Sequence, residues 1–208
     1  MSSRLVSRSK SAFATRAIHG AGEGDPATGA LVAPICQSTT FRQLGIGRDL
    51  GHTYSRASNP TVASLERALG ALEGALPAVC TSSGMAAITT LFLSVLGQGE
   101  RVVVGDVVYG GTVRLLRQVL ANFGVEPVFV DTSDLGALER ALLDGARVLF
   151  LESPANPTLK LTDLAAASAA ARAAGALCVV DNTFLTPAHQ DAFALGADVV
   201  VHSTTKYL

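Results

Sequence analysis

The sequence predicts an α/β protein whose main part is a three-layer domain built on a mainly parallel sheet. From residue 59 onward, short apolar runs alternate with segments of helical periodicity. Several runs, such as 102–104 and 199–201, consist of valine alone. Strands that are apolar on both faces are typical of parallel sheets covered by helices on both sides. A chain of 208 residues is long enough to bury one large core of this kind.

The order of the elements follows from capping residues and periodicity. Asn59 and Pro60 form the start of a first helix, and Gly74 ends it. We predict strands at 78–81, 101–105, 125–130, 148–151, 177–181 and 199–202. Helices are predicted at 85–96, 112–122, 135–143 and 161–174. Residues 1–58 have weak periodicity and are expected to form an extended N-terminal arm that contacts a partner subunit, with the domain at 59–208.

Composition narrows the possible classes of function. A net charge near −1 gives no reason to expect nucleic acid or a membrane as a partner. The three cysteines, Cys36, Cys80 and Cys178, form no C-x-x-C pair, so we expect no metal site and a reducing compartment. The N-terminus has no apolar stretch typical of a secretory signal, and no segment reaches membrane-spanning length. The cytoplasm is therefore the expected location.

Small and aromatic residues follow the first two predicted strands, where open parallel sheets bind their ligands. Ser83, Gly84 and Met85 lead into an apolar helix, and backbone N–H groups at such a position can bind a phosphate. A simple helix cap is the alternative. Tyr109 stands before two glycines that permit a tight turn. Its ring could stack on a planar cofactor or could be an ordinary loop tyrosine.

Three further polar residues follow later strands. Asn156 lies between two prolines that stiffen its loop, and it either binds a ligand or stabilises a turn. Asp181 ends a buried strand, so its carboxylate needs a partner, which could be a cofactor or a simple salt bridge. Lys206 follows the last strand, near the hydroxyls of Ser203 and Thr205. A desolvated lysine there could form a Schiff base, although a lone lysine is usually a solvated surface residue.

The combination of these features is more specific than any one of them. A phosphate cradle, an aromatic ring, a carboxylate and a lysine are what pyridoxal phosphate (PLP) requires from a protein. A nucleotide-dependent oxidoreductase is the rival on a similar sheet. It would need a glycine-rich fingerprint after the first strand, and the segment following residue 81 contains none.

The sequence from residue 13 to 208 resembles the Cys/Met-metabolism PLP-dependent enzymes, a family that includes cystathionine γ-synthase, cystathionine γ-lyase and methionine γ-lyase. The resemblance is carried by residues 14–19, 34–41, 54–61, 83–87, 109–112, 152–157, 180–184 and 203–207. It implies the large domain of the PLP-dependent transferase fold, which is aspartate aminotransferase-like and of fold type I. It also implies PLP as the cofactor.

The resemblance assigns a role to each candidate residue. Lys206 would be the Schiff-base lysine, Asp181 would pair with the ring nitrogen, and Tyr109 would stack on the ring and assist proton transfer. Asn156 would contact the ring hydroxyl. The phosphate would be bound by Ser83, Gly84, Met85, Ser203 and Thr205, and by Tyr54 and Arg56 of a neighbouring subunit. The expected assembly is therefore a homodimer or homotetramer.

The implied reaction is γ-elimination or γ-replacement on a sulfur amino acid in transsulfuration. Substrates would be cystathionine, or an activated homoserine with cysteine. Methionine γ-lyase, O-acetylhomoserine sulfhydrylase and an inactive PLP-binding fragment are alternatives. Methionine γ-lyases of the family typically have a cysteine where this chain has Gly111, which favours a cystathionine enzyme. Because the chain stops two residues after Lys206, we expect it to be truncated before a C-terminal domain that carries the substrate-binding arginine.

Overall fold

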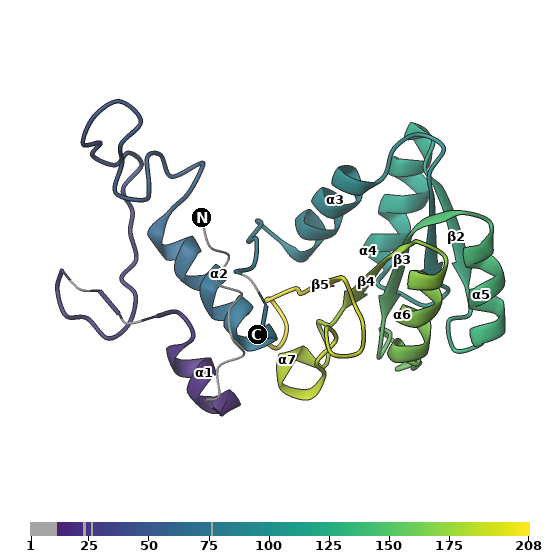
Figure 1. Cartoon of the computed structure of the whole chain (residues 1–208). Helices are drawn as coiled ribbons and strands as arrows, with labels where there is room; N and C mark the ends of the chain where they lie inside the picture. Colours follow the sequence, from purple (N-terminus) through teal and green to yellow (C-terminus); the bar gives the residue numbers. More distant parts are fainter. Residues whose placement is uncertain (1–11, 23, 26, 76) are drawn as a thin grey trace. The chain divides into compact units, whose positions relative to one another are not determined.

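The computed structural model describes residues 12–22, 24–25, 27–75 and 77–208. The chain folds into two compact units, Met1–Cys80 and Thr81–Leu208 (Figure 1). The helix that begins at Pro60 thus belongs to the first unit, whereas the sequence suggested a boundary at 58/59. The assignment of residues 1–58 as an arm that contacts a partner stays a prediction.

In its described residues, the first unit contains two helices, α1 (Phe13–His19) and α2 (Pro60–Glu73). The predicted ends of α2 are confirmed: the Asn59 side chain accepts a hydrogen bond from the Thr61 N–H at 2.9 Å, and Gly74 ends the helix at φ 65°. The prediction of an extended arm was wrong at α1, which packs against α2. The described residues between the two helices form turns and isolated bridges, such as the one between Thr40 and Tyr54.

The strand predicted at residues 78–81 does not form. The N–H of Ala78 donates to the backbone carbonyl of Glu66 at 2.9 Å, and the N–H of Cys80 donates to the Glu66 carboxylate at 2.9 Å. These donors are therefore bonded to α2 instead of a neighbouring strand. Val79 is 82% exposed, so the apolar run that suggested a buried strand is not buried in this chain.

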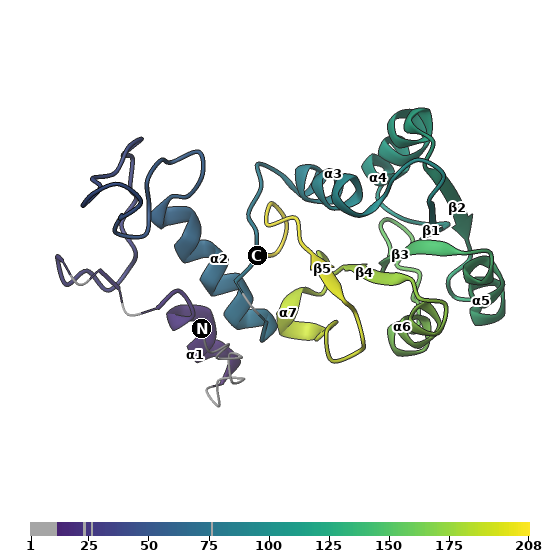
Figure 2. The same ribbon diagram turned by 45° about the horizontal axis from the view of Figure 1, so that its top comes forward.

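The second unit is built on a five-stranded sheet in which all neighbouring strands are parallel (Figure 2). Its strands are β1 (Arg101–Gly105), β2 (Glu126–Val130), β3 (Ala146–Glu152), β4 (Leu177–Asp181) and β5 (Val199–Val201). The spatial order is β2-β1-β3-β4-β5. The predicted parallel sheet is confirmed, and the chain reverses its direction of winding between β1 and β3, where such sheets bind ligands.

Helices cover both faces of this sheet. They are α3 (Gly84–Val95), α4 (Gly110–Arg114), α5 (Leu135–Leu143), α6 (Leu164–Ala173) and α7 (Thr186–His189). The helix predicted at 112–122 is not continuous, because α4 passes into a π-helical turn, η1 (Leu115–Val119), and a 3₁₀ turn, η2 (Leu120–Phe123). The short helix α7 was not predicted, since four residues show no periodicity.

Two hydrophobic cores fill the space between the layers. On one face Phe92 of α3 packs on Phe150 of β3, with ring centroids 5.3 Å apart. On the other face Leu138 of α5 and Ala167 of α6 pack on Leu149. Burying an aliphatic or aromatic side chain of this size contributes about 1.5–3 kcal/mol. The three-layer α/β architecture is thereby confirmed, and it holds the carboxyl ends of the strands in place.

Candidate active site

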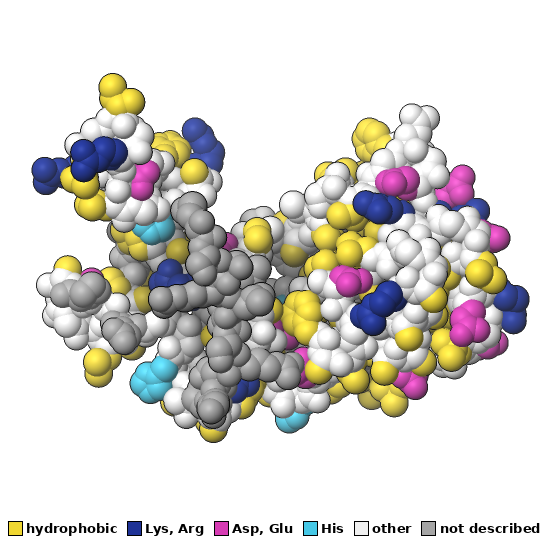
Figure 3. Space-filling view, in the orientation of Figure 1, with side chains coloured by type: hydrophobic (Ala, Val, Ile, Leu, Met, Phe, Trp, Pro, Cys, Tyr) yellow, Lys and Arg dark blue, Asp and Glu magenta, His cyan; other side chains and the backbone are white. Residues whose placement is uncertain are grey.

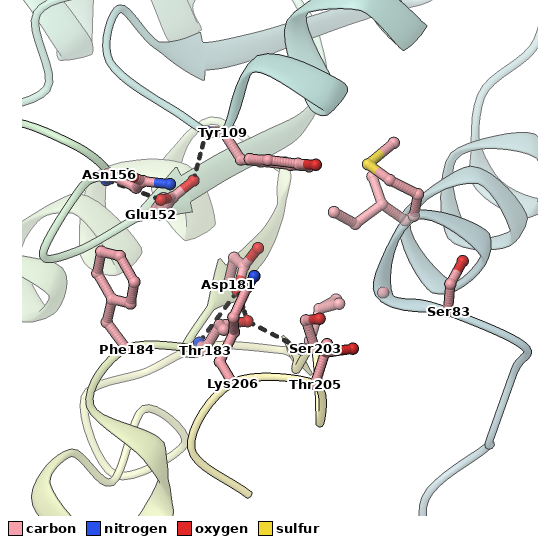
Figure 4. Close-up of a pocket in the computed structure, with 14 residues that line it drawn as sticks. Ser83, Tyr109, Glu152, Asn156, Asp181, Thr183, Phe184, Ser203, Thr205 and Lys206 are labelled. Atoms are coloured by element: carbon pink, nitrogen blue, oxygen red, sulfur yellow. Dashed lines mark hydrogen bonds between the residues drawn. The ribbon is translucent and has the colours of Figure 1, made fainter.

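The carboxyl ends of four strands surround one pocket in the second unit (Figure 4). Its volume is about 280 Å³, at the small end of the range for small-molecule sites. It is lined by Ser83, Gly84, Met85, Ile88, Tyr109, Glu152, Asn156, Asp181, Thr183, Phe184, Val201, Ser203, Thr205 and Lys206. The structure therefore brings together all the candidate residues that the sequence placed after residue 80.

The N-terminus of α3 forms one wall of the pocket. The Ser83 hydroxyl caps the helix by accepting the Ala86 N–H at 3.1 Å, and the first backbone bond of the helix reaches Ser83 from Ala87. The N–H groups of Gly84 and Met85 precede that bond and remain available for an anion. A Cβ on Gly84 would lie 2.8 Å from the Cβ of Ser203. Only glycine therefore allows the loop before Lys206 to approach the helix so closely.

Asp181 is the buried acid of the pocket, with 8% of its surface exposed. Its Oδ1 accepts hydrogen bonds from the hydroxyl of Thr183 at 2.5 Å and from the Thr183 N–H at 3.1 Å. Oδ2 takes part in neither bond. Burial raises the pKa of the Asp181 carboxyl, and the bonds from Thr183 act in the opposite direction. A cationic N–H at this position would relieve the cost of the buried charge.

Thr183 also connects Asp181 to the segment that carries the lysine. Its hydroxyl oxygen accepts the N–H of Ser203 at 2.9 Å, and Lys206 closes the following turn by donating its N–H to the Ser203 carbonyl at 3.1 Å. The sequence interpretation missed this connection. The signal that could have found it is the spacing, because a threonine two residues after a strand-ending aspartate can donate back to that carboxylate.

Glu152 is a second residue that sequence reasoning did not single out. It ends β3 and stands in register with Asp181 of β4. Its Oε2 accepts the Tyr109 N–H at 2.6 Å and its Oε1 accepts the Asn156 N–H at 2.9 Å. Burial raises the pKa of this carboxyl, and the two backbone bonds lower it. The apolar run was taken to end at residue 151, which left Glu152 in the loop.

Two candidate residues, Tyr54 and Arg56, lie in the first unit. The guanidinium carbon of Arg56 is 4.8 Å from the centroid of the Tyr54 ring, a cation–π contact that holds the two side chains together. Their predicted contact with the phosphate in a neighbouring subunit stays a prediction.

The pocket suits PLP by the chemistry of its walls. The approach of Ser203 to Gly84 places hydroxyl and backbone donors together for a phosphate. Tyr109 faces Asp181 and Lys206 across the cavity (Figure 4), as suits a ring that stacks on an aromatic side chain and bonds to an acid through its nitrogen. Among the described residues, no group of three or more His, Cys, Asp or Glu side chains could hold a metal ion.

A family model described as Cys/Met metabolism PLP-dependent enzyme matches residues 14–208. The chain belongs to this family. Its members use PLP as their cofactor, so the phosphate cradle, the buried acid and the lysine found in the pocket have a common explanation.

Individual relatives agree with the family assignment. A probable cystathionine γ-synthase of Herpetosiphon aurantiacus is 45% identical over 196 residues, which are 94% of this chain and 61% of that protein. A cystathionine γ-lyase of Bacillus subtilis is 45% identical over 194 residues, 93% of this chain and 51% of that protein. The crystal structure of metB from Corynebacterium glutamicum superposes with a TM-score of 0.94 at 40% identity, covering 97% of this chain and 52% of that one.

The chain thus spans between about half and three fifths of the relatives it matches. Equal identity to a synthase and to a lyase does not separate these two activities. No helix in the described part of the chain combines the length and the apolarity needed to cross a membrane.

Proposed function

We propose that this chain is the PLP-binding part of an enzyme that catalyses γ-elimination or γ-replacement on a sulfur amino acid, of the cystathionine γ-lyase or γ-synthase type. The observation that carries the proposal is the convergence of Lys206, Asp181 and Tyr109 on one pocket at the carboxyl ends of the sheet. The substrates would be cystathionine, or an activated homoserine together with cysteine.

Each pocket residue has a task in this reaction. The Nζ of Lys206 would hold the cofactor covalently and would move the proton first from Cα and then from Cβ of the substrate. The carboxylate of Asp181 keeps the ring nitrogen protonated. When bound, PLP supplies an electron-poor ring that stabilises negative charge on the substrate. Tyr109 orients the ring by stacking and assists proton transfer.

The remaining polar groups would fix the position of the cofactor. Asn156 would donate to the ring hydroxyl. The phosphate would be bound by the N–H groups of Gly84 and Met85, beside Ser83, and by the hydroxyls of Ser203 and Thr205. We further propose that Tyr54 and Arg56 complete the phosphate site of a partner subunit, so that the active form is a homodimer or homotetramer. The cytoplasmic location stays a prediction.

Gly111 supports the cystathionine-type activity over that of a methionine γ-lyase. A Cβ at this position would lie 2.5 Å from Cε1 of Tyr109 and 2.8 Å from the sulfur of Met85. The observed position of the Tyr109 ring therefore requires glycine, whereas methionine γ-lyases typically have a cysteine there. A side chain at residue 111 would move the aromatic ring that faces the substrate.

The test uses the protein at its full length. Its visible spectrum is recorded with added PLP, before and after borohydride reduction, and the reduced cofactor is located by peptide mapping. We expect the label on Lys206, with Lys160 unlabelled as an internal control. Lys206→Ala should abolish turnover of cystathionine, because no other lysine lines the pocket as described. Substantial turnover by that variant, or a label elsewhere, would rule out the assigned role.

A further inference from the structure

Glu152 bonds to the two loops that carry Tyr109 and Asn156. Its two carboxylate oxygens act separately: Oε2 accepts the Tyr109 N–H at 2.6 Å, and Oε1 accepts the Asn156 N–H at 2.9 Å (Figure 4). Tyr109 immediately precedes α4, and Asn156 lies in the loop after β3. A single side chain at the end of β3 therefore ties the start of a helix to a separate loop.

The chemistry of these bonds requires two acceptors in one side chain. Both partners are backbone N–H donors, and an ionised carboxylate is the side chain that offers only acceptors on both of its atoms. A glutamine of the same size would place an NH₂ group against one of the donors. A bond of this kind to a charged group is shorter and stronger than a neutral one.

The place of Glu152 in the sheet connects these bonds to the cofactor site. It stands in register with Asp181, whose carboxylate is proposed to bind the ring nitrogen. Tyr109 and Asn156 are proposed to contact the ring face and the ring hydroxyl. Asp181, Tyr109 and Asn156 would together define the plane and the rotation of the ring, and they lie at or after the ends of adjacent strands. Glu152 bonds to two of them, Tyr109 and Asn156.

We propose that Glu152 is a positioning residue that orients bound PLP by holding the Tyr109 ring and the Asn156 amide in place. The inference rests on the proposed function, since it concerns the same cofactor. It differs from a purely structural role because the bonds fix groups that face the pocket and belong to separate segments. Substitution of a residue that only stabilised the fold would change the free energy of unfolding without changing the environment of the cofactor.

The experiment compares Glu152→Gln with wild type at full length by PLP titration and by circular dichroism of the bound cofactor. We expect Glu152→Gln to raise the Kd for PLP about tenfold and to change the size of the induced dichroism band, because one N–H loses its acceptor. Asp198→Asn is the matched control. The Asp198 Oδ2 also accepts a backbone N–H, that of Cys178 at 2.9 Å, but at the opposite end of β4.

The outcomes distinguish a failure of the proposed function from a failure of the positioning role of Glu152. If wild type itself binds no PLP, the proposed function fails. If wild type binds PLP and Glu152→Gln shows the same Kd and the same band, the positioning role is overturned. An equal loss in Asp198→Asn would also overturn it, since the effect would then be general.

Should Glu152→Gln not fold, Glu152→Asp gives the second test. It retains the charge, but its shorter side chain can reach only one of the two loops. We expect a Kd above that of wild type and an altered dichroism band. A folded Glu152→Asp protein with wild-type affinity and band would refute the inference.

Discussion

The charged residues at the amino ends of the strands, the amino edge of the sheet, lie in a very different environment from those at the carboxyl ends, the carboxyl edge. At the amino edge, Arg101 pairs with Glu126 at 3.4 Å and with Asp144 at 3.3 Å, and these acids are 60% and 73% exposed. At the carboxyl edge, Asp181 is buried and Glu152 is partly buried. Figure 3 shows acidic and basic side chains interspersed over the outer surface of the second unit, where water solvates them.

The difference indicates where this chain departs from an arrangement that favours stability alone. Exposed ion pairs cost little and contribute little. A buried carboxylate carries a desolvation cost, which is the reason why burial raises the pKa of both Asp181 and Glu152. Acids whose pKa is perturbed in this way gather at functional sites, although structural networks also contain them. The comparison therefore predicts that changes to the buried acids of the carboxyl edge exchange stability for function, whereas changes to the exposed pairs of the amino edge affect neither strongly.

The largest effect is expected from Asp181→Asn. Turnover should fall at least about hundredfold, because the group that stabilises charge on the cofactor is lost. The cofactor-free protein should at the same time gain of the order of 1 kcal/mol in its free energy of unfolding near neutral pH, since a buried charge is removed. Asparagine keeps the Oδ1 that accepts both bonds from Thr183. Steady-state kinetics and urea unfolding measure the two quantities.

The pH dependence of that gain checks its cause. The raised pKa means that the folded protein retains the Asp181 proton at pH values where the unfolded chain has released it. The contribution of Asp181 to the free energy of unfolding of the wild type therefore falls as the pH rises above 3.8, its ordinary pKa, and through its raised pKa in the folded protein. The advantage of Asp181→Asn should shrink as the pH is lowered toward 3.8. A gain that is independent of pH would contradict the assignment of the cost to a buried charge.

A smaller effect is expected from Thr183→Val, which preserves the shape of the side chain. The variant removes the hydroxyl that donates to Asp181 and accepts the Ser203 N–H, so the segment leading to Lys206 loses one of its attachments. PLP affinity should fall about tenfold, measured by titration of the visible band.

Thr28→Val is the control for that variant. The Thr28 hydroxyl likewise donates to a carboxylate, that of Asp25 at 2.6 Å, and accepts a backbone N–H, that of Ala30 at 3.3 Å. This threonine lies in the first unit on an exposed turn. We expect it to leave PLP affinity unchanged. Equal losses in both variants would show that the hydroxyl of Thr183 has no special link to the cofactor.

Sequence patterns predicted the second unit better than the first for a physical reason. The strands 101–105 and 177–181 and the helix 135–143 were located to the residue, because buried valine runs and amphipathic periodicity reflect the core directly. The helix α1 has no buried residue, so it leaves little periodic signal. The strand predicted at 78–81 is the reverse case: the apolar run is hydrogen-bonded to Glu66, and Val79 within it is exposed.

Pocket residues could be predicted from the sequence where their position at a strand end is itself the signal. Lys206, Asp181 and Tyr109 follow strand ends, so their convergence could be inferred from topology alone. Glu152 and Thr183 act through hydrogen bonds to segments far away along the chain, such as Ser203 and Tyr109. Such partners are set by tertiary structure and are not encoded in local periodicity.

The smallest expected effect comes from comparing two clusters of charged residues, one around Lys160 at the carboxyl edge and one around Arg101 at the amino edge. Lys160 Nζ lies 3.0 Å from each oxygen of Asp106 and 2.6 Å from Oδ1 of Asp131, so it joins the loops after β1 and β2 to its own. The bond from Lys160 is the main reason why the pKa of Asp131 lies well below its usual range. Arg101 joins the start of β2 to Asp144, which ends α5 just before β3, and the sheet already holds these segments together.

Lys160→Met should therefore lower the midpoint of thermal unfolding more than Arg101→Met does. The two acids left behind repel each other, and the stabilisation due to Asp131 is present above its ordinary pKa and lost as pH falls through the lowered value. The difference between Lys160→Met and wild type should accordingly be largest near neutral pH and decrease in strong acid. Equal, pH-independent losses in the two variants would show that both clusters are ordinary surface pairs, which would confine the special character of the carboxyl edge to the pocket itself.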